Sequence, residues 1–163
     1  MLLASFMNIK LTALNFPENY QFRLKQSEGI NYIFCIIRKK WLILTPEEWV
    51  RQHIVHYLIH EKKYTNTSIN TEVVVEIVGM KKRADIIVYR KDKPLIIVEC
   101  KAPSIKINQE TFDQIARYNM KLDADYLMVS NGLEHYYCQM DYENSSYVFL
   151  PELPTNPNFS NSN

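Results

Sequence analysis

Two short apolar segments constrain the fold of this chain more than any other feature of its sequence. They run from Ala84 to Tyr89 and from Leu95 to Cys100, and nearly every residue in them is hydrophobic. Continuous apolar runs of this length are typical of central β-strands that are covered on both faces. The sequence therefore predicts an α/β or α+β fold with a mixed central β-sheet flanked by helices.

The remaining patterns predict the elements around these two strands. Two strand-like runs, 20–25 and 30–37, flank a turn at Glu28-Gly29 and predict an N-terminal β-hairpin. Thr45, Pro46 and Glu48 combine an N-cap, a first-turn proline and a capping-box glutamate, so a helix is expected to about Lys63. Later patterns predict a strand from 69, a basic turn over 79–83, a second helix over 109–122, and strands over 125–130 and 134–140.

Length and composition limit the organisation of the chain. Its 163 residues, 47% of them hydrophobic, are enough for one sizeable core. We expect a hairpin extension over residues 1–44, a core domain over 45–153 and a disordered tail over 154–163. No run approaches the roughly 20 apolar residues of a membrane span, and the opening segment does not resemble a signal peptide. A cytoplasmic protein without a membrane partner is therefore expected.

Several classes of site are not indicated. The three cysteines have no CxxC spacing, and none of the three glycines lies in a phosphate-binding loop, so we expect neither a thiolate zinc site nor ATP binding by this chain. His53, His56 and His60 share one flank of the first predicted helix. They lack a matching Cys or carboxylate ligand, so they predict a solvated helix face. Glu72, at the start of a strand, could be a peripheral metal ligand, but as a strand-end carboxylate it is expected to be solvated. The net charge of +1 means that any contact with nucleic acid must be local.

Three charged residues stand at the two most apolar strands, where charge is rarely placed without a partner. One interpretation is a structural ion pair between Asp85 and Lys101. The other is a metal site. Glu99 and Lys101 lie at i and i+2 of a strand and face one cleft, where the Asp85 carboxylate and the Cys100 backbone carbonyl could also converge. Oxygen ligands of this kind suit Mg²⁺, with Mn²⁺ as a substitute, and such a site can hydrolyse phosphodiesters.

The same residues resemble a known motif. Arg83-Ala84-Asp85, thirteen residues, then Glu99-Cys100-Lys101 resembles the PD-(D/E)xK nuclease motif, with Ala84 in place of the proline. The segment Gln114-Ile-Ala-Arg-Tyr118 resembles the QxxxY element of related nucleases. From Leu44 to about Tyr137 the chain is similar to the N-terminal domain of type I restriction enzyme R subunits. This resemblance implies a restriction-endonuclease-like core.

The resemblance also implies roles for particular residues. The catalytic set is Asp85, Glu99, Lys101, Glu48 and Gln114, and the metal ligands are Asp85, Glu99, Glu48 and the Cys100 carbonyl. The implied DNA contacts are Lys81, Lys82, Arg83, Gln114 and Tyr118. For Glu48 a second interpretation stays open, because this residue also completes the capping box of Thr45.

The function implied by the resemblance is that of a Mg²⁺-dependent endodeoxyribonuclease in restriction, defence or DNA processing. The alternative is a catalytically silent module of the same fold that binds nucleic acid or protein. DNA is the expected partner, together with a second copy of the chain or another subunit of a restriction system.

Overall fold

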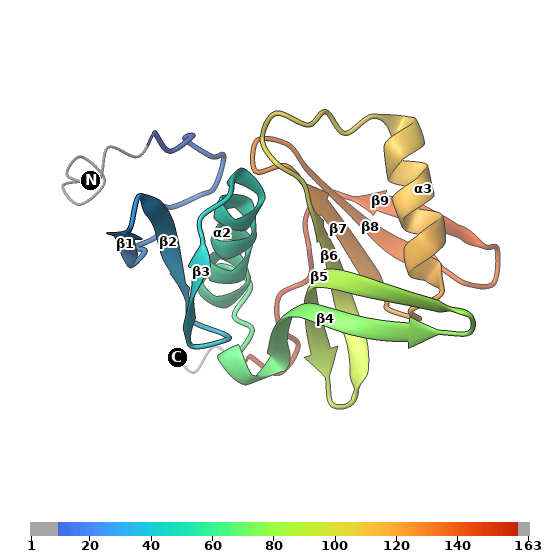
Figure 1. The fold of residues 1–163 in the computed structure, drawn as a ribbon. Coiled ribbons are helices and arrows are strands. Elements are labelled where there is room, and N and C mark those ends of the chain that lie inside the picture. The colour runs from blue at the N-terminus through green and yellow to red at the C-terminus, as the bar shows by residue number, and fades with distance from the viewer. Residues whose placement is uncertain (1–9, 160–163) are drawn as a thin grey trace.

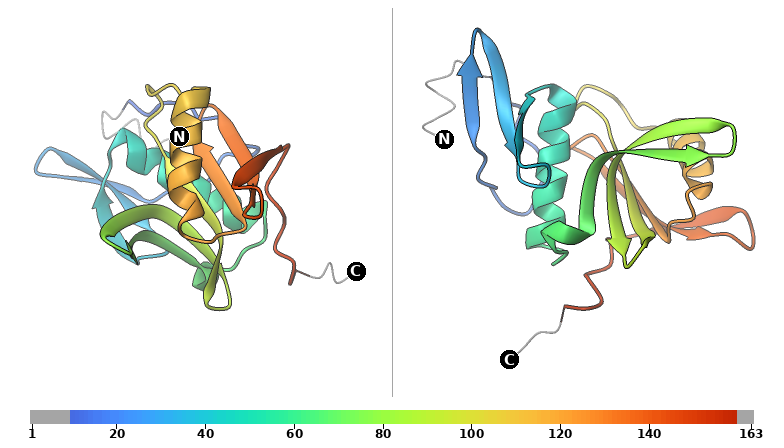
Figure 2. Two further views of the ribbon diagram at one scale, coloured as in Figure 1. Left: turned by 90° about the vertical axis from the view of Figure 1, so that its right-hand side faces the viewer. Right: turned by 60° about the horizontal axis from the view of Figure 1, so that its bottom comes forward.

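The structure is a computed structural model that describes residues 10–159. Its elements form four layers, visible in Figure 1: a three-stranded sheet, the helix α2, a six-stranded sheet and the helix α3. The views in Figure 2 show the same succession of layers. The predicted class, an α+β fold with a mixed sheet between helices, is confirmed.

The three-stranded sheet is antiparallel and has the order β1-β2-β3. Its strands are β1 (Leu24–Ser27), β2 (Ile30–Cys35) and β3 (Lys40–Ile43). The predicted hairpin corresponds to β1 and β2, joined by a turn in which Glu28 and Gly29 both have positive φ. The third strand was missed, because Lys40-Trp41-Leu42-Ile43 is too short to show a strand pattern by itself.

The six-stranded sheet has the order β4-β5-β6-β7-β8-β9. Its strands are β4 (Ile69–Ile77), β5 (Met80–Arg90), β6 (Lys93–Cys100), β7 (Tyr126–Ser130), β8 (His135–Asp141) and β9 (Ser146–Leu150). Only β6 and β7 are parallel, and α3 (Gln109–Met120) lies on the crossover between them. The basic turn predicted over 79–83 is wrong beyond Gly79, because Met80 to Arg83 already pair with β4.

Each face of the six-stranded sheet is covered by one helix, as the apolar runs predict. On one side α2 (Pro46–His60) places Val50, Ile54 and Leu58 against Ile86, Val98 and Met128 of the sheet. On the other side, Phe112 and Ala116 of α3 pack with Ile87, Ile97 and Leu127. Central strands buried on both faces explain why β5 and β6 are apolar almost throughout. A short 3₁₀ helix, η1 (Asn66–Ser68), leads into β4.

The C-terminal segment differs from the disordered tail expected from residue 154. Leu153 is buried in the core on the α2 side, and Tyr64 donates a hydrogen bond to the Pro154 carbonyl at 2.9 Å. The Asn156 N–H donates to the Lys62 carbonyl at 2.8 Å. Backbone pairing therefore fixes this polar segment as far as it is described, while residues 160–163 lie outside the described part. None of the described helices has the length and apolar character needed to cross a bilayer.

Candidate functional site

Asp85 lies where the pairing of β5 with β6 stops. The ladder between the two strands begins at Ile86 and Val98, one residue further into the sheet. Beyond that pair, the Cys100 N–H donates to the Asp85 side chain at 2.8 Å instead of to a backbone carbonyl. The carboxylate therefore takes the place of a backbone acceptor where the strands separate. This contact of the Cys100 N–H was not predicted from the sequence, which predicted a role for the Cys100 carbonyl.

The hairpin formed by β4 and β5 is kinked beside Asp85, so its apolar side chains change there from one face of the sheet to the other. Ile69 and Ile86 pack on the α2 side of the sheet, whereas Val73 and Ala84 pack on the α3 side. Between them the residue pairing skips Glu72, whose φ of 51° lies in the left-handed region that non-glycine residues rarely adopt. This kink turns the Glu72 side chain towards α2. Glu72 is therefore not the freely solvated strand end that the sequence predicts.

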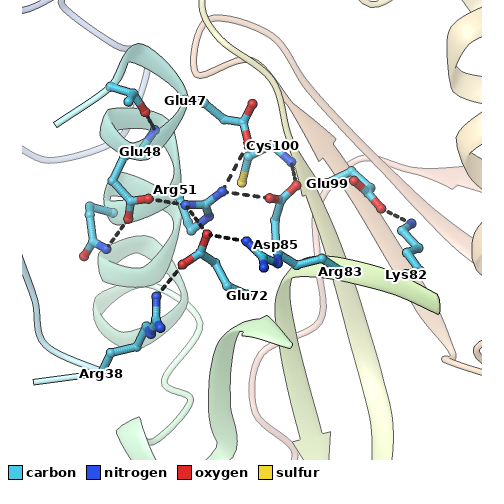
Figure 3. Close-up of polar contacts among 12 residues, drawn as sticks. Arg38, Glu47, Glu48, Arg51, Glu72, Lys82, Arg83, Asp85, Glu99 and Cys100 are labelled. Carbon is cyan, nitrogen blue, oxygen red and sulfur yellow. Dashed lines mark hydrogen bonds and ion pairs between the residues drawn. The ribbon is translucent and has the colours of Figure 1, made fainter. Parts of the chain in front are cut away.

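Arg51 of α2 lies at the centre of the charged cluster shown in Figure 3. Its guanidinium forms an ion pair with Asp85 at 2.9 Å and with Glu47 at 3.1 Å, and lies 3.8 Å from Glu72. It also donates a hydrogen bond to Glu48. Burial opposes the charge on Arg51, but Glu48 and Asp85 hold its pKa above the ordinary value. Four carboxylates from three elements therefore surround one fixed cation.

Glu48 lies in the first turn of α2, but its side chain does not complete the capping box that the sequence left open as one interpretation. Its backbone N–H is capped by the Thr45 hydroxyl at 3.0 Å. Its side chain does not return to the cap, but accepts hydrogen bonds from Arg51 and, at 2.8 Å, from Gln52. The residue is only 5% exposed, and burial raises the pKa of its carboxyl despite the neighbouring Arg51. A carboxylate in this position would gain from a second cation nearby.

Glu99 is the last residue but one of β6 and is turned towards α3, away from Arg51. It accepts hydrogen bonds from Lys82 of β5 and, at 3.4 Å, from the Asn119 amide. Burial raises the pKa of Glu99 above its ordinary value, and the charge of nearby Asp85 adds to this, although Lys82 works in the opposite direction. Asp85 and Glu99 thus both lie just beyond the last residue pair between β5 and β6, and each is neutralised by a different cation.

The other predicted site residues lie around this pair. Lys101 follows β6 and is close enough to Glu47 to lower its carboxyl pKa, against the larger raising effects of burial and Asp85. Within the described residues Asp85 pairs with Arg51 and not with Lys101, so the simple ion-pair interpretation is not what the structure shows. On α3, the Tyr118 ring lies 4.5 Å from the Lys82 ammonium, whereas Gln114 is exposed.

The basic cluster expected to contact DNA is largely paired with acidic side chains. Lys81 lies 3.3 Å from Glu76, Arg83 lies 3.8 Å from Glu72, and Lys82 bonds to Glu99. Lys81 and Arg83 remain well exposed at 75% and 67%. They could still reach a phosphate, but the acidic partners reduce the positive electrostatic potential around them.

The donor set of this cluster fits a hard divalent cation, since it consists of carboxylate oxygens that are partly shielded from water. Among residues 10–159, however, no group of three or more His, Cys, Asp or Glu side chains is close enough to hold a metal as the side chains stand. The contacts give the reason: Arg51 lies between Glu48 and Asp85, while Glu99 is turned away from them and pairs with Lys82. A metal would have to replace these two internal cations.

Sequence reasoning missed several members of the cluster, among them Arg51, Gln52 and Asn119. Arg51 pairs with Asp85 across 34 residues of sequence, and Asn119 bonds to Glu99 across 20, so no local pattern reveals either contact. The sequence indicated these contacts only indirectly. A polar residue on the inner side of a helix needs a partner, and Asn119 is 1% exposed and Gln52 fully buried.

The fold and the cluster define the class of this protein as an α+β domain that gathers acidic and basic side chains at one end of a mixed sheet. The model of the family described as "Type I restriction enzyme R protein N terminus" matches residues 46–154. The chain belongs to this family, and the predicted resemblance is confirmed. A search of curated proteins finds no match.

One solved structure is similar, a fragment described as an HsdR subunit of a type I restriction enzyme from Vibrio vulnificus YJ016. The two share 23% sequence identity over 69% of this chain, with a TM-score of 0.48. The chain spans only 24% of that fragment's length.

Proposed function

We propose that this chain is a Mg²⁺-dependent nuclease that hydrolyses DNA phosphodiester bonds. The observation that carries the proposal is the position of Asp85 and Glu99 just beyond the last residue pair between β5 and β6, with Lys101 two residues after Glu99. Membership in a family of restriction enzyme R proteins agrees with this activity. The expected setting is restriction, defence or DNA processing.

Asp85, Glu99 and Glu48, with the Cys100 carbonyl, are the residues that would hold the ion. Bound there, Mg²⁺ supplies charge for the scissile phosphate and lowers the pKa of a coordinated water. Mn²⁺ is expected to substitute for it. The raised pKa values of Glu48 and Glu99 support such a ligand set, because these carboxylates lack enough positive charge around them.

The remaining residues act on the substrate. Lys101 carries an ammonium that cannot bind a metal, so its role is to orient water or to stabilise charge on the phosphate. Gln114 and Tyr118 lie one helical turn apart on α3 and would contact the DNA backbone, together with Lys81 and Arg83. Lys82 would contact DNA once it is released from Glu99.

The second candidate is a catalytically silent module that binds nucleic acid or protein. The pairing of every carboxylate with Arg51 or Lys82 favours it, since internal ion pairs are enough to keep such a cluster stable. In either case, any translocation along DNA is expected to come from another subunit, and a second copy or another subunit would add to the DNA affinity of this chain.

Calorimetric titration of the purified chain with Mn²⁺ or Mg²⁺ distinguishes the two candidates. The nuclease proposal predicts saturable binding that Asp85→Asn removes while the fold, followed by circular dichroism, is unchanged. Asp113→Asn is the matched control, because Asp113 is a partly exposed carboxylate on α3 that bonds to Tyr147 and not to the cluster around Arg51. Absence of binding by the unaltered chain would favour the silent module.

A further inference from the structure

One face of the three-stranded sheet carries aromatic rings beneath basic side chains. Lys25, Tyr32 and Ile43 lie opposite one another across the strands, and Phe34 pairs with Trp41 two residues along. The Arg23 guanidinium lies 4.3 Å from the Phe34 ring centre, and the Lys25 ammonium lies 4.5 Å from that of Trp41. Alternate residues of a strand point to the same side, so these groups form one continuous surface, here called the aromatic face.

The aromatic face is not needed to attach the sheet to the rest of the molecule. Attachment uses the opposite side, where Ile33 and Cys35 are fully buried. On the aromatic face Tyr32, Phe34 and Trp41 are only partly buried, and Ile43 is 56% exposed. Figure 2 shows this sheet as the outermost layer, beyond α2. A partner can therefore reach the rings and the cations together.

The charge of this layer differs from that of the whole chain. Residues 23–43 contain five basic residues and one acidic residue, Glu28, whereas the chain as a whole has a net charge of only +1. Arg38 is paired with Glu72, but the described residues offer no carboxylate partner to Arg23, Lys25, Lys39 or Lys40. The layer is thus a local basic surface of the kind that attracts an anionic polymer.

A groove connects the aromatic face with the candidate site. It has a volume of about 700 Å³ and runs between β3 and the start of α2. Tyr32, Trp41 and Ile43 line one end, while Glu48, Arg51 and Glu72 line the other. A linear polymer bound on the aromatic face could therefore extend along the groove to the carboxylates around Arg51.

We propose that the aromatic face and this groove bind single-stranded nucleic acid and guide the strand into the site. The inference rests on the proposed function, because it names the form of substrate that the site receives. Aromatic rings bind exposed base faces by stacking, while lysine and arginine bind the phosphates between them. In a duplex the base faces are already stacked on one another. An acidic peptide would use the cations but not the rings, so a single strand fits the whole surface best.

Tryptophan fluorescence gives a direct test, because the chain has only Trp41 and Trp49. In a Trp49→Phe background Trp41 is the single reporter, and EDTA prevents cleavage. We expect oligo(dT) to quench this fluorescence in a saturable manner, with a dissociation constant roughly tenfold or more lower than that of a duplex of equal length. Tyr32→Ala should weaken binding by at least about tenfold, the loss expected for one stacked base.

Lys25→Ala tests the cations without disturbing the fold, because Lys25 is exposed. Its binding should fall, and the slope of log affinity against log salt should decrease by about one, as expected for one lost phosphate contact. Lys91→Ala, an exposed lysine in the turn between β5 and β6, is the matched control and should change neither quantity.

Three results would overturn the inference: no quenching by oligo(dT), equal affinity for the duplex, or equal quenching by polyglutamate, which would indicate an acidic protein partner. The calorimetric metal titration is independent of all three. A chain that binds Mn²⁺ at Asp85 but not oligo(dT) would retain the proposed nuclease site and lose only the proposed strand guide.

Discussion

The charged residues of the two sheets are arranged in opposite ways. At the end of the six-stranded sheet, Asp85 and Glu99 each have a basic partner, Arg51 and Lys82, in a largely buried cluster. On the three-stranded sheet, basic side chains lie over aromatic rings and face solvent. Charge in the first region is therefore neutralised within the protein, whereas charge in the second is available to a ligand.

The same substitution in both regions gives the largest contrast in stability. Arg51→Met leaves Glu48 buried without its cation, so we expect the free energy of unfolding to fall by about 3–5 kcal/mol. Arg23→Met removes an exposed guanidinium from an aromatic ring and should cost at most about 1 kcal/mol. Urea denaturation at neutral pH measures both. Similar losses in the two variants would show that the two regions do not differ in this respect.

Two lysine substitutions separate catalysis from binding. Lys101→Ala should lower the cleavage rate by roughly 10²–10³-fold, as is typical when one group that stabilises the transition state is lost, and leave metal affinity unchanged. Lys25→Ala should instead weaken substrate binding and leave the rate at saturation unchanged. Steady-state kinetics and metal titration of both variants check this. Loss of metal binding in Lys101→Ala would refute the role assigned to that lysine.

The contact between α2 and the N-terminal layer should depend on pH. His53 lies in that contact, with its ring centre 4.6 Å from that of Phe22, and burial lowers its pKa from 6.5 to about 4. A depressed histidine pKa means that the unfolded chain binds the proton more tightly. The stability that neutral His53 contributes is therefore present above pH 6.5 and is lost as pH falls towards 4, by up to about 3 kcal/mol.

Urea denaturation between pH 7 and pH 4.5 measures this loss in the free energy of unfolding. His53→Leu cannot take up the proton, so its stability should change less between pH 7 and pH 4.5 than that of the unaltered chain. Equal pH dependence of the two proteins would show that His53 is not responsible. The solvated helix face predicted for the histidines is wrong for His53 and His56, which are 9% and 8% exposed.

Local sequence patterns predicted the parts of the molecule that depend on local interactions. The start of α2 follows from its cap, since Thr45 bonds to the Glu48 N–H. The strands that carry Asp85 and Glu99 follow from their apolar runs. The buried histidines could not be predicted in this way, because Phe16, Tyr20 and Phe22 cover them from a segment without regular structure.

Within the site, local patterns predicted which residue types are present but not which residues they contact. Glu72 turns towards Arg51 because of a positive φ in the middle of a strand, which no residue preference indicates. The aromatic face was missed for a similar reason. Its residues come from three strands, and only the cross-strand register brings Arg23, Phe34 and Trp41 together.

Cleavage of DNA by the purified chain tests the central claim most directly. With Mg²⁺ we expect slow cleavage of a single-stranded substrate and nicking of plasmid, and none in EDTA. Asp85→Ala and Glu99→Ala should each lower the rate by at least about 10³-fold, since the lost metal chemistry is worth several kcal/mol, while the folded content measured by circular dichroism is retained. Full activity in either variant would contradict the assignment of the site.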